Sequence, residues 1–443
     1  MPTFYDRSAA LVTLGCKVNQ SESEALGRRL SERGLRLVPF DSSADLYIIN
    51  TCTVTATADR KSRQLIRRAR RHNPSSLVIV TGCYASVHRS PLHSVAQADL
   101  VVSNDSKGHL ADLALEALGH ATRTVTGVAA PADVGAAPHG HTRAFVKAQD
   151  GCADFCAYCI VPYARGRPTS VPAQEIVSRI RSLASQGPGR HQGQGCQEVV
   201  LSGVHLGSYG ADQDHSSTDL YDLRRLIVQI LRDTPIPRLR LSSLEPQDIS
   251  PDLFELWRDP RLCRHLHLPL QSGCNRTLAR MRRRYTRQDF AFLVEEARRA
   301  IPGVSITTDL IAGFPGESPE DFLESLAFVE GMRFARAHVF PYSPRPGTLA
   351  VGLPDQVPEP VKRERCARLR AVSQQSAAAF RRGFLGQTLE VLWEERAAGN
   401  RWSGLTDNYL RVSAESALFL ANRITPTLIT ALEGEGLKGS VLA

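Results

Sequence analysis

The chain has 443 residues, of which 42% are hydrophobic and 22% are charged. This composition is typical of soluble globular proteins, and the length suits two or three domains. Lysine and arginine outnumber acidic residues by 54 to 45, and the resulting charge of +9 suits an anionic partner such as nucleic acid. No apolar run reaches about 18 residues and the N-terminus lacks the pattern of a secretory signal, so we expect a cytoplasmic protein without a membrane span.

Three cysteines in the first hundred residues follow short apolar runs that are rich in β-branched residues: Cys16, Cys52 and Cys83. Such runs predict buried strands, and the helical stretches 21–33 and 55–72 between them predict a parallel sheet. Because parallel strands end at one edge, the three thiols are expected to converge. A buried cysteine is also an ordinary small core residue, but three at matching strand ends favour a metal cluster.

A stretch rich in Pro, Gly and Ala at 128–140 predicts a linker. Beyond it, the predicted strand 143–148 is followed by Cys152, Cys156 and Cys159, with the spacing C-x3-C-x2-C. No further Cys or His follows closely, as a zinc site normally requires. Three thiolates on a cubic iron–sulfur cluster leave one iron open for a ligand, whereas a zinc knuckle completed by a distant residue is the alternative.

Six predicted strands alternate with helices in the middle of the chain, which predicts a partial β/α barrel. In such barrels the active groups follow the carboxyl ends of strands, and the cysteine loop follows the first strand. The strands are expected at 143–148, 198–202, 238–242, 265–268, 305–309 and 336–340, with helices at 216–233, 252–259, 286–300 and 318–330.

The C-terminal part begins after a predicted helix at 360–383, and its sequence pattern no longer alternates between strands and helices. Short strands separated by turn signals predict a small β-barrel of a kind that often binds oligonucleotides, with a structural cap as the alternative. These strands are expected at 388–395, 404–412, 424–430 and 437–442. The four remaining cysteines show no pattern and are interpreted as structural: Cys196, Cys263, Cys274 and Cys366.

Taken together, these motifs resemble the methylthiotransferases of the radical S-adenosylmethionine (SAM) superfamily. The loop Gly151–Gly166 is similar to the radical SAM signature, and the stretches around Cys16, Cys52 and Cys83 resemble the auxiliary-cluster domain of that family. The C-terminal segment is similar to the TRAM domain, an RNA-binding β-barrel. The resemblance implies an α/β protein with an N-terminal methylthiotransferase domain, a linker, a radical SAM core and a TRAM-like domain, at 1–127, 128–140, 141–380 and 381–443.

The resemblance also implies the cofactors. Cys152, Cys156 and Cys159 are expected to hold a 4Fe-4S cluster whose open iron binds SAM, and the other triad to hold a second 4Fe-4S cluster. The family reaction replaces the hydrogen on carbon 2 of an adenine ring by a methylthio group, with SAM as both methyl donor and radical source. It requires an electron donor, which we expect to be flavodoxin- or ferredoxin-like.

Contacts to SAM are expected at the ends of the barrel strands, from Gly203, Glu245, Gln271 and Gly313. Turn geometry and barrel capping are the alternative roles of these residues. Beyond the cluster ligands, no catalytic side chain is expected.

Contacts to RNA are expected from two basic segments. Arg63 and Arg67 share one face of a predicted helix, and Arg283 and Arg284 lie in a second basic run beside Tyr285, which is expected to stack on a base. A run of charge is also typical of a solvated surface, so RNA contact rests on the resemblance.

The stretch Leu14-Gly-Cys-Lys-Val-Asn-Gln20 resembles the branch of the family that acts on N6-threonylcarbamoyladenosine beside the anticodon of tRNA. Two other branches remain as alternatives: one acts on N6-isopentenyladenosine in tRNA and the other on an aspartate of a ribosomal protein. A non-enzymatic iron–sulfur protein that binds RNA or acts as a sensor is the alternative from a different class.

Overall fold

The computed structural model describes residues 7–88, 97–120, 142–185, 195–213 and 222–442, and the chain divides into two compact units. The first unit comprises Met1–Gly140, Gly151–Asp154 and Cys159–Arg167, and the second comprises His141–Asp150, Phe155–Tyr158 and Pro168–Ala443. The expected linker at 128–140 lies outside the described residues. Within the described ranges, no helix is long and apolar enough to cross a membrane.

The first unit contains a five-stranded parallel sheet with the order β2-β1-β3-β4-β5. Its central strands β3 and β4 are rich in β-branched residues and are buried on both faces, as is typical of parallel sheets. The predicted parallel sheet is therefore confirmed. The strands are β1 Ser8–Thr13, β2 Arg36–Val38, β3 Leu46–Thr51, β4 Leu77–Gly82 and β5 Leu100–Val102.

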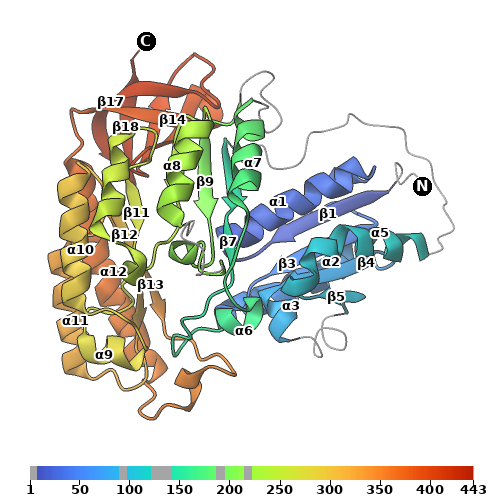
Figure 1. Ribbon diagram of the computed structural model, residues 1–443, viewed down its shortest axis with the longest axis horizontal. Helices are drawn as coiled ribbons and strands as arrows, with labels where there is room; N and C mark the ends of the chain where they lie inside the picture. Colours follow the sequence, from blue (N-terminus) through green and yellow to red (C-terminus); the bar gives the residue numbers. More distant parts are fainter. Residues whose placement is uncertain (1–6, 89–96, 121–141, 186–194, 214–221, 443) are drawn as a thin grey trace. The chain divides into compact units, whose positions relative to one another are not determined.

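Helices cover both faces of this sheet (Figure 1). Helix α2 (Ala56–His72) packs Ile66 and Ala69 against one face, and α1 (Lys17–Glu32) and α5 (Leu110–His120) cover the other. Short elements complete the unit: α3 Cys83–Val87, η1 Asn104–His109 and α6 Val161–Arg165.

The second unit contains six parallel strands in chain order, arranged as the sheets β10-β9-β6 and β11-β12-β13. Single bridges from Leu239 to Leu262 and from Ser243 to His267 connect the two sheets. The predicted partial barrel is confirmed. Its strands are β6 Arg143–Lys147, β9 Glu198–Ser202, β10 Arg238–Leu241, β11 His265–His267, β12 Ser305–Ala312 and β13 Arg336–Pro341.

Helices pack on the apolar face of these six strands and form the largest core (Figure 1). Thr286 and Ser318 begin α10 and α11 with reciprocal capping boxes. The expected helix at 252–259 is instead a 3-10 stretch, η4 (Pro251–Arg258), and α7 was not predicted. The helices are α7 Ala173–Ser185, α8 Leu223–Asp233, α9 Asn275–Arg280, α10 Arg287–Ala300, α11 Pro319–Met332 and α12 Glu359–Arg382. Minor elements are β7 Gln149–Asp150, β8 Thr169–Ser170, η2 Leu206–Ser208, η3 Pro246–Asp248 and η5 Leu349–Gly352.

The C-terminal strands form a closed barrel with the order β14-β15-β16-β18-β17 around Trp393 and Trp402. The single strand expected at 404–412 is wrong, because a turn divides it. Tyr409 has a φ of 67°, and the Thr406 hydroxyl accepts a hydrogen bond from the Leu410 amide. The strands are β14 Thr388–Arg396, β15 Arg401–Thr406, β16 Arg411–Glu415, β17 Ile424–Glu433 and β18 Gly436–Val441.

A fully buried ion pair lies within the half-barrel, and its arginine also contacts the C-terminal barrel. Arg240 donates two hydrogen bonds to Glu198, at 2.7 and 2.9 Å, and both side chains are 0% exposed. Arg240 also donates to the carbonyl oxygens of Thr406 and Asp407, in the turn of the C-terminal barrel. Burial alone would raise the pKa of Glu198, but the guanidinium outweighs it and holds the pKa below its usual range.

Glu198→Gln is expected to lower the free energy of unfolding by about 3 to 5 kcal/mol, because it leaves the Arg240 charge buried without its counter-ion. Denaturant unfolding of the Glu198→Gln/Arg240→Met double variant should show partial recovery. Glu296→Gln is the control, since it removes a partner of the 71% exposed Arg299 and should cost less than about 1 kcal/mol. Unfolding of Glu198→Gln at the wild-type denaturant concentration would contradict this account.

Candidate metal centres

The first cysteine triad lies at the carboxyl edge of the parallel sheet. Cys16 is the N-cap of α1, Cys52 follows β3 directly, and Cys83 begins α3 directly after β4. The three strands concerned are neighbours in the sheet. Burial raises the pKa of the Cys52 thiol to about 11, and the sulfurs of Cys83 and Cys16 add to the shift. The three cysteines therefore lie at one edge of the sheet, after neighbouring strands, as the sequence predicts.

Two glycines permit this convergence. Gly15 has a φ of +100°, and a Cβ atom there would lie 2.9 Å from the Cys52 Cβ. Gly82 has a φ of +94°, and a Cβ atom there would lie 2.3 Å from the carbonyl oxygen of Thr51. Any other residue would be strained and would push the adjacent cysteine away from its partners.

Two asparagines from the sequence motifs connect the loops that carry the triad. The Asn19 side chain donates to the carbonyl oxygens of Leu14 and Thr51, at 2.7 and 3.0 Å. Asn50 donates to the carbonyl oxygen of Asn19 at 2.8 Å. The loop after β1 and the end of β3 are thus held together before any ligand binds.

Two buried cations lie beside this triad and share one carboxylate. Arg165 and Lys107 both pair with Glu22, and their side chains are 1% and 11% exposed. Lys107 also donates to the Asn50 side chain at 2.9 Å, and the Cys83 sulfur is one of the groups that act on its pKa. The Arg165 charge opposes the effect of burial on Cys16, but burial is the larger effect and raises the pKa of that thiol. Sequence reasoning missed this pair, because its members lie far apart along the chain.

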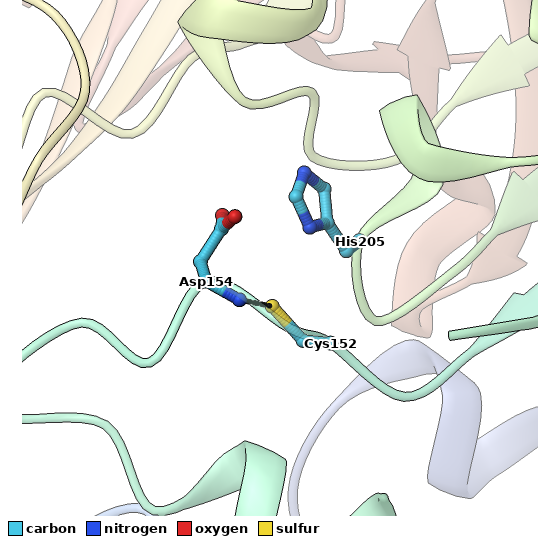
Figure 2. A group of neighbouring side chains, drawn as sticks. All are labelled: Cys152, Asp154 and His205. Carbon is cyan, nitrogen blue, oxygen red and sulfur yellow. Dashed lines mark hydrogen bonds between the residues drawn. The ribbon is translucent and has the colours of Figure 1, made fainter. Parts of the chain in front are cut away.

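The second triad lies in the loop after β7 that precedes α6. Cys152, Cys156 and Cys159 are half-buried and carry thiols that form no disulfide. The amide of Asp154 donates to the Cys152 sulfur at 3.5 Å, as Figure 2 shows. Gly151 has a φ of +74°, and a Cβ atom there would lie 2.0 Å from the Arg167 carbonyl oxygen. Cys156 belongs to the second unit, as part of the short segment Phe155–Tyr158.

Arg283 is buried beside Cys156. The sequence predicted an exposed arginine in contact with RNA, so this expectation is wrong. The Arg283 side chain is 3% exposed, pairs with Glu245 and donates to the Cys156 sulfur at 3.3 Å. Burial opposes its charge, but neighbouring groups, led by Tyr158 and Glu245, hold the pKa of Arg283 well above its usual value. Tyr285 is also buried and donates to the Pro269 carbonyl oxygen at 2.7 Å, so it is not placed to stack on a base.

The residues expected to contact SAM follow the strands of the half-barrel. Gly203 follows β9, where a Cβ atom would lie 3.0 Å from the Gln149 side chain. Gln271 has a φ of 65°, and its amide donates to the Asp309 carbonyl oxygen at 2.8 Å. Gly313 follows β12, where a Cβ atom would lie 2.4 Å from the Lys362 stem, so this glycine accommodates α12. Glu245 follows β10 and is engaged with Arg283 as described.

The other arginines expected to contact RNA differ in exposure. Arg67 and Arg284 are exposed, whereas Arg63 is half-buried and donates to the Tyr84 hydroxyl at 3.0 Å. The four cysteines interpreted as structural are all buried: Cys196, Cys263, Cys274 and Cys366.

The inner face of the half-barrel carries a polar cluster that sequence reasoning missed. His267, Asp309 and His338 come from β11, β12 and β13, and their ligand-type atoms lie within 4.8 Å of one another. Asp309 and His338 are direct partners in the register of the two strands. The signal for this cluster is the alternation of β12 and β13, whose other faces are apolar and packed under helices.

Comparison with known proteins agrees with this geometry. The pattern of the uncharacterized protein family UPF0004 matches residues 8–103, and that of the radical SAM superfamily matches residues 146–329. A solved radical S-adenosylmethionine methyltransferase, TsrM from Kitasatospora setae, has a similar fold with a TM-score of 0.56, covering 78% of this chain and 77% of that one. At 17% sequence identity, this likeness concerns the fold alone.

Two curated relatives align over almost the whole chain. The threonylcarbamoyladenosine tRNA methylthiotransferase of Bacillus subtilis is 38% identical over 419 residues, covering 91% of this chain and 90% of the relative. The tRNA-2-methylthio-N(6)-dimethylallyladenosine synthase of Acetivibrio thermocellus is 33% identical over 446 residues, covering 98% and 90% respectively. Both triads lie within the matched regions, and the chain belongs to the radical SAM tRNA methylthiotransferase family.

Proposed function

We propose that this protein adds a methylthio group to carbon 2 of N6-threonylcarbamoyladenosine beside the anticodon of tRNA. The observation that carries the proposal is the presence of two separate cysteine triads, one at the carboxyl edge of a parallel sheet and one in the loop after β7. A single cluster suffices for a SAM-derived radical, and the second triad provides a separate place for sulfur.

The donor sets fit the 4Fe-4S clusters and the SAM of this family. Each triad offers three thiols that form no disulfide, which leaves one iron of a cubic cluster open for another ligand. Each triad also has a buried cation nearby, Lys107 beside Cys83 and Arg283 beside Cys156, and positive charge stabilises thiolate-bound clusters. When bound, the loop cluster and SAM supply the radical that removes the carbon 2 hydrogen, and the auxiliary cluster and a second SAM supply the methylthio group.

The side chains of this chain hold and orient these groups. Cys152, Cys156 and Cys159 would hold one cluster, with Arg283 donating to the Cys156 sulfur from a position fixed by Glu245. Cys16, Cys52 and Cys83 would hold the other, with Asn19 and Asn50 keeping their loops in place. Gly203, Glu245, Gln271 and Gly313 remain our candidates for surrounding SAM at the strand ends.

The partner implied by the relatives is tRNA. We propose that the C-terminal barrel, β14 to β18, is a TRAM-like RNA-binding domain that follows the core at about residue 381, and that Arg67 and Arg284 contact phosphates. We also propose a cytoplasmic location and a flavodoxin- or ferredoxin-like electron donor, because cleavage of SAM consumes one electron.

The choice of substrate branch rests on two observations. The stretch Leu14–Gln20 resembles the threonylcarbamoyladenosine branch, and the relatives of that name are 34% to 38% identical. The relatives named tRNA-2-methylthio-N(6)-dimethylallyladenosine synthase are 32% to 34% identical and also align over almost the whole chain. The isopentenyl (dimethylallyl) substrate is therefore the second candidate.

Gly82→Ala is expected to lower the iron content of anaerobically reconstituted protein from about eight to about four atoms per chain, the amount in one 4Fe-4S cluster. The added methyl group meets the Thr51 carbonyl oxygen and displaces Cys83. Gly108→Ala is the matched control in the same unit, because a Cβ atom there has no neighbour within 4 Å. Full iron content in Gly82→Ala would contradict the role given to Gly82, because it would show that the second cluster does not depend on this glycine to place Cys83.

Cys16→Ala and Cys156→Ala are expected to separate the roles of the two triads. Cys16→Ala should abolish methylthio transfer while SAM cleavage to 5′-deoxyadenosine continues, because the loop cluster keeps its ligands. Cys156→Ala should abolish cleavage itself. Chromatographic measurement of 5′-deoxyadenosine and of methylthiolated nucleoside decides this, and the opposite pattern would reverse the assignment.

In anaerobic assays with SAM and a reductant, tRNA bearing N6-threonylcarbamoyladenosine is expected to gain the methylthio group. The threonylcarbamoyl group carries a carboxylate that an arginine-rich chain is suited to bind. Nucleoside mass spectrometry should compare this tRNA with isopentenyladenosine tRNA, and protein mass spectrometry should test the ribosomal-protein alternative. Modification of the isopentenyl substrate alone would refute the branch assignment but not the family assignment.

A further inference from the structure

A groove runs along the free edge of the half-barrel sheet. Strand β13 is the last strand of the order β11-β12-β13, so among the described residues no strand pairs with its outer edge. The groove has a volume of about 330 Å³ and is lined by the whole stretch Ala335–Phe340, by α12, and by Glu435 between β17 and β18. It therefore lies where the half-barrel, α12 and the C-terminal barrel meet within one unit.

Helix α12 caps the backbone of this edge. Ser373 accepts a hydrogen bond from the Ala337 amide at 2.9 Å, and Arg370 donates to the Val339 carbonyl oxygen at 3.0 Å. These contacts satisfy edge groups that would otherwise pair with another strand. The groove is thus unsuited to β-strand addition, and its side chains determine what it binds.

The groove is basic and carries one exposed aromatic ring. Arg336, Arg370 and Arg381 line it, against the single carboxylate of Glu435, which acts on Arg381. Arg336 and Phe340 lie on the same face of β13 because strand side chains alternate, and Phe340 is 43% exposed.

We propose that this groove binds a single-stranded segment of the substrate RNA next to the modified nucleotide. Arginine forks match phosphate geometry, and an exposed aromatic ring stacks on any unpaired base. The volume is at the lower end of the range of small-molecule pockets, which suits one nucleotide at a time. The proposal rests on the proposed function, and it adds a binding surface outside the two metal centres.

The location supports the same occupant. His338 lines the groove and also belongs to the polar cluster with His267 and Asp309 on the inner face of the half-barrel. A strand of RNA in the groove would therefore lie beside the interior of the half-barrel, at whose strand ends we place SAM. An acidic peptide would satisfy the arginines but would leave Phe340 without a stacking partner.

The test measures binding of tRNA bearing N6-threonylcarbamoyladenosine to the reconstituted protein as a function of salt. Arg336→Gln/Arg370→Gln/Arg381→Gln should lower the slope of log affinity against log salt by about 2 and the affinity at about 0.1 M salt by about 100-fold. The control variant Arg232→Gln/Arg258→Gln/Arg299→Gln removes the same charge from exposed positions elsewhere in this unit and should change both much less.

Two further measurements separate the possible explanations. Phe340→Ala should weaken binding by about 5-fold or more, and Phe340→Tyr should restore it, because stacking needs only the ring. An oligouridylate should compete for the groove, whereas polyglutamate should not. Arg336→Glu alone is the fallback if the triple variant does not fold, since Arg336 is exposed.

Equal slopes and affinities for wild type and the groove variants would overturn the proposal, as would equal competition by polyglutamate. If the wild type binds and methylthiolates the tRNA while the groove variants match it, only the groove assignment fails. If the wild type neither binds nor modifies any tRNA offered, the proposed function itself fails.

Discussion

Parallel strands joined by helical crossovers all end at the same edge of their sheet, and the chemistry of this protein depends on that constraint. In the first unit, the constraint places cysteines from three distant parts of the sequence beside one another. In the second unit, it brings Gly203, Glu245, Gln271 and Gly313 to the ends of the half-barrel strands. Neither site requires its residues to be close in sequence.

Close approach at these edges leaves little room for side chains. A Cβ atom on Gly82 would clash with the backbone of the neighbouring strand, and a Cβ atom on Gly151 would clash with the backbone that follows α6. Both glycines directly precede cysteines, so their conformations fix where the thiols begin. Such rigid loops favour the binding of a cluster, because the cysteine ligands need little reorganisation when the cluster binds.

Three cationic side chains are largely buried, two of them beside cysteines and one in the core of the half-barrel. Arg283, Lys107 and Arg240 are all largely withdrawn from water, and each is paired with a carboxylate. For Arg240, the result is a rigid connection between the half-barrel and the C-terminal barrel. Arg283 also donates a hydrogen bond to the Cys156 sulfur, and Lys107 lies close enough to Cys83 for that sulfur to affect the pKa of the lysine.

The sequence by itself predicted most of the strands and the two cysteine triads that we propose as cluster ligands, because hydrophobic periodicity and cysteine spacing are local properties of the chain. All six strands of the half-barrel appear where alternation predicts them, with ends shifted by up to three residues. The strand expected at 404–412 was wrong because a turn divides it at Thr406-Asp-Asn, a turn signal that the sequence contains and that the left-handed residue Tyr409 completes. Only the tertiary structure decided the burial of Arg283, the Lys107–Glu22–Arg165 network and the groove beside β13. These features depend on contacts between residues far apart in sequence, so the composition of a basic run cannot distinguish a solvated arginine from one held against a cysteine.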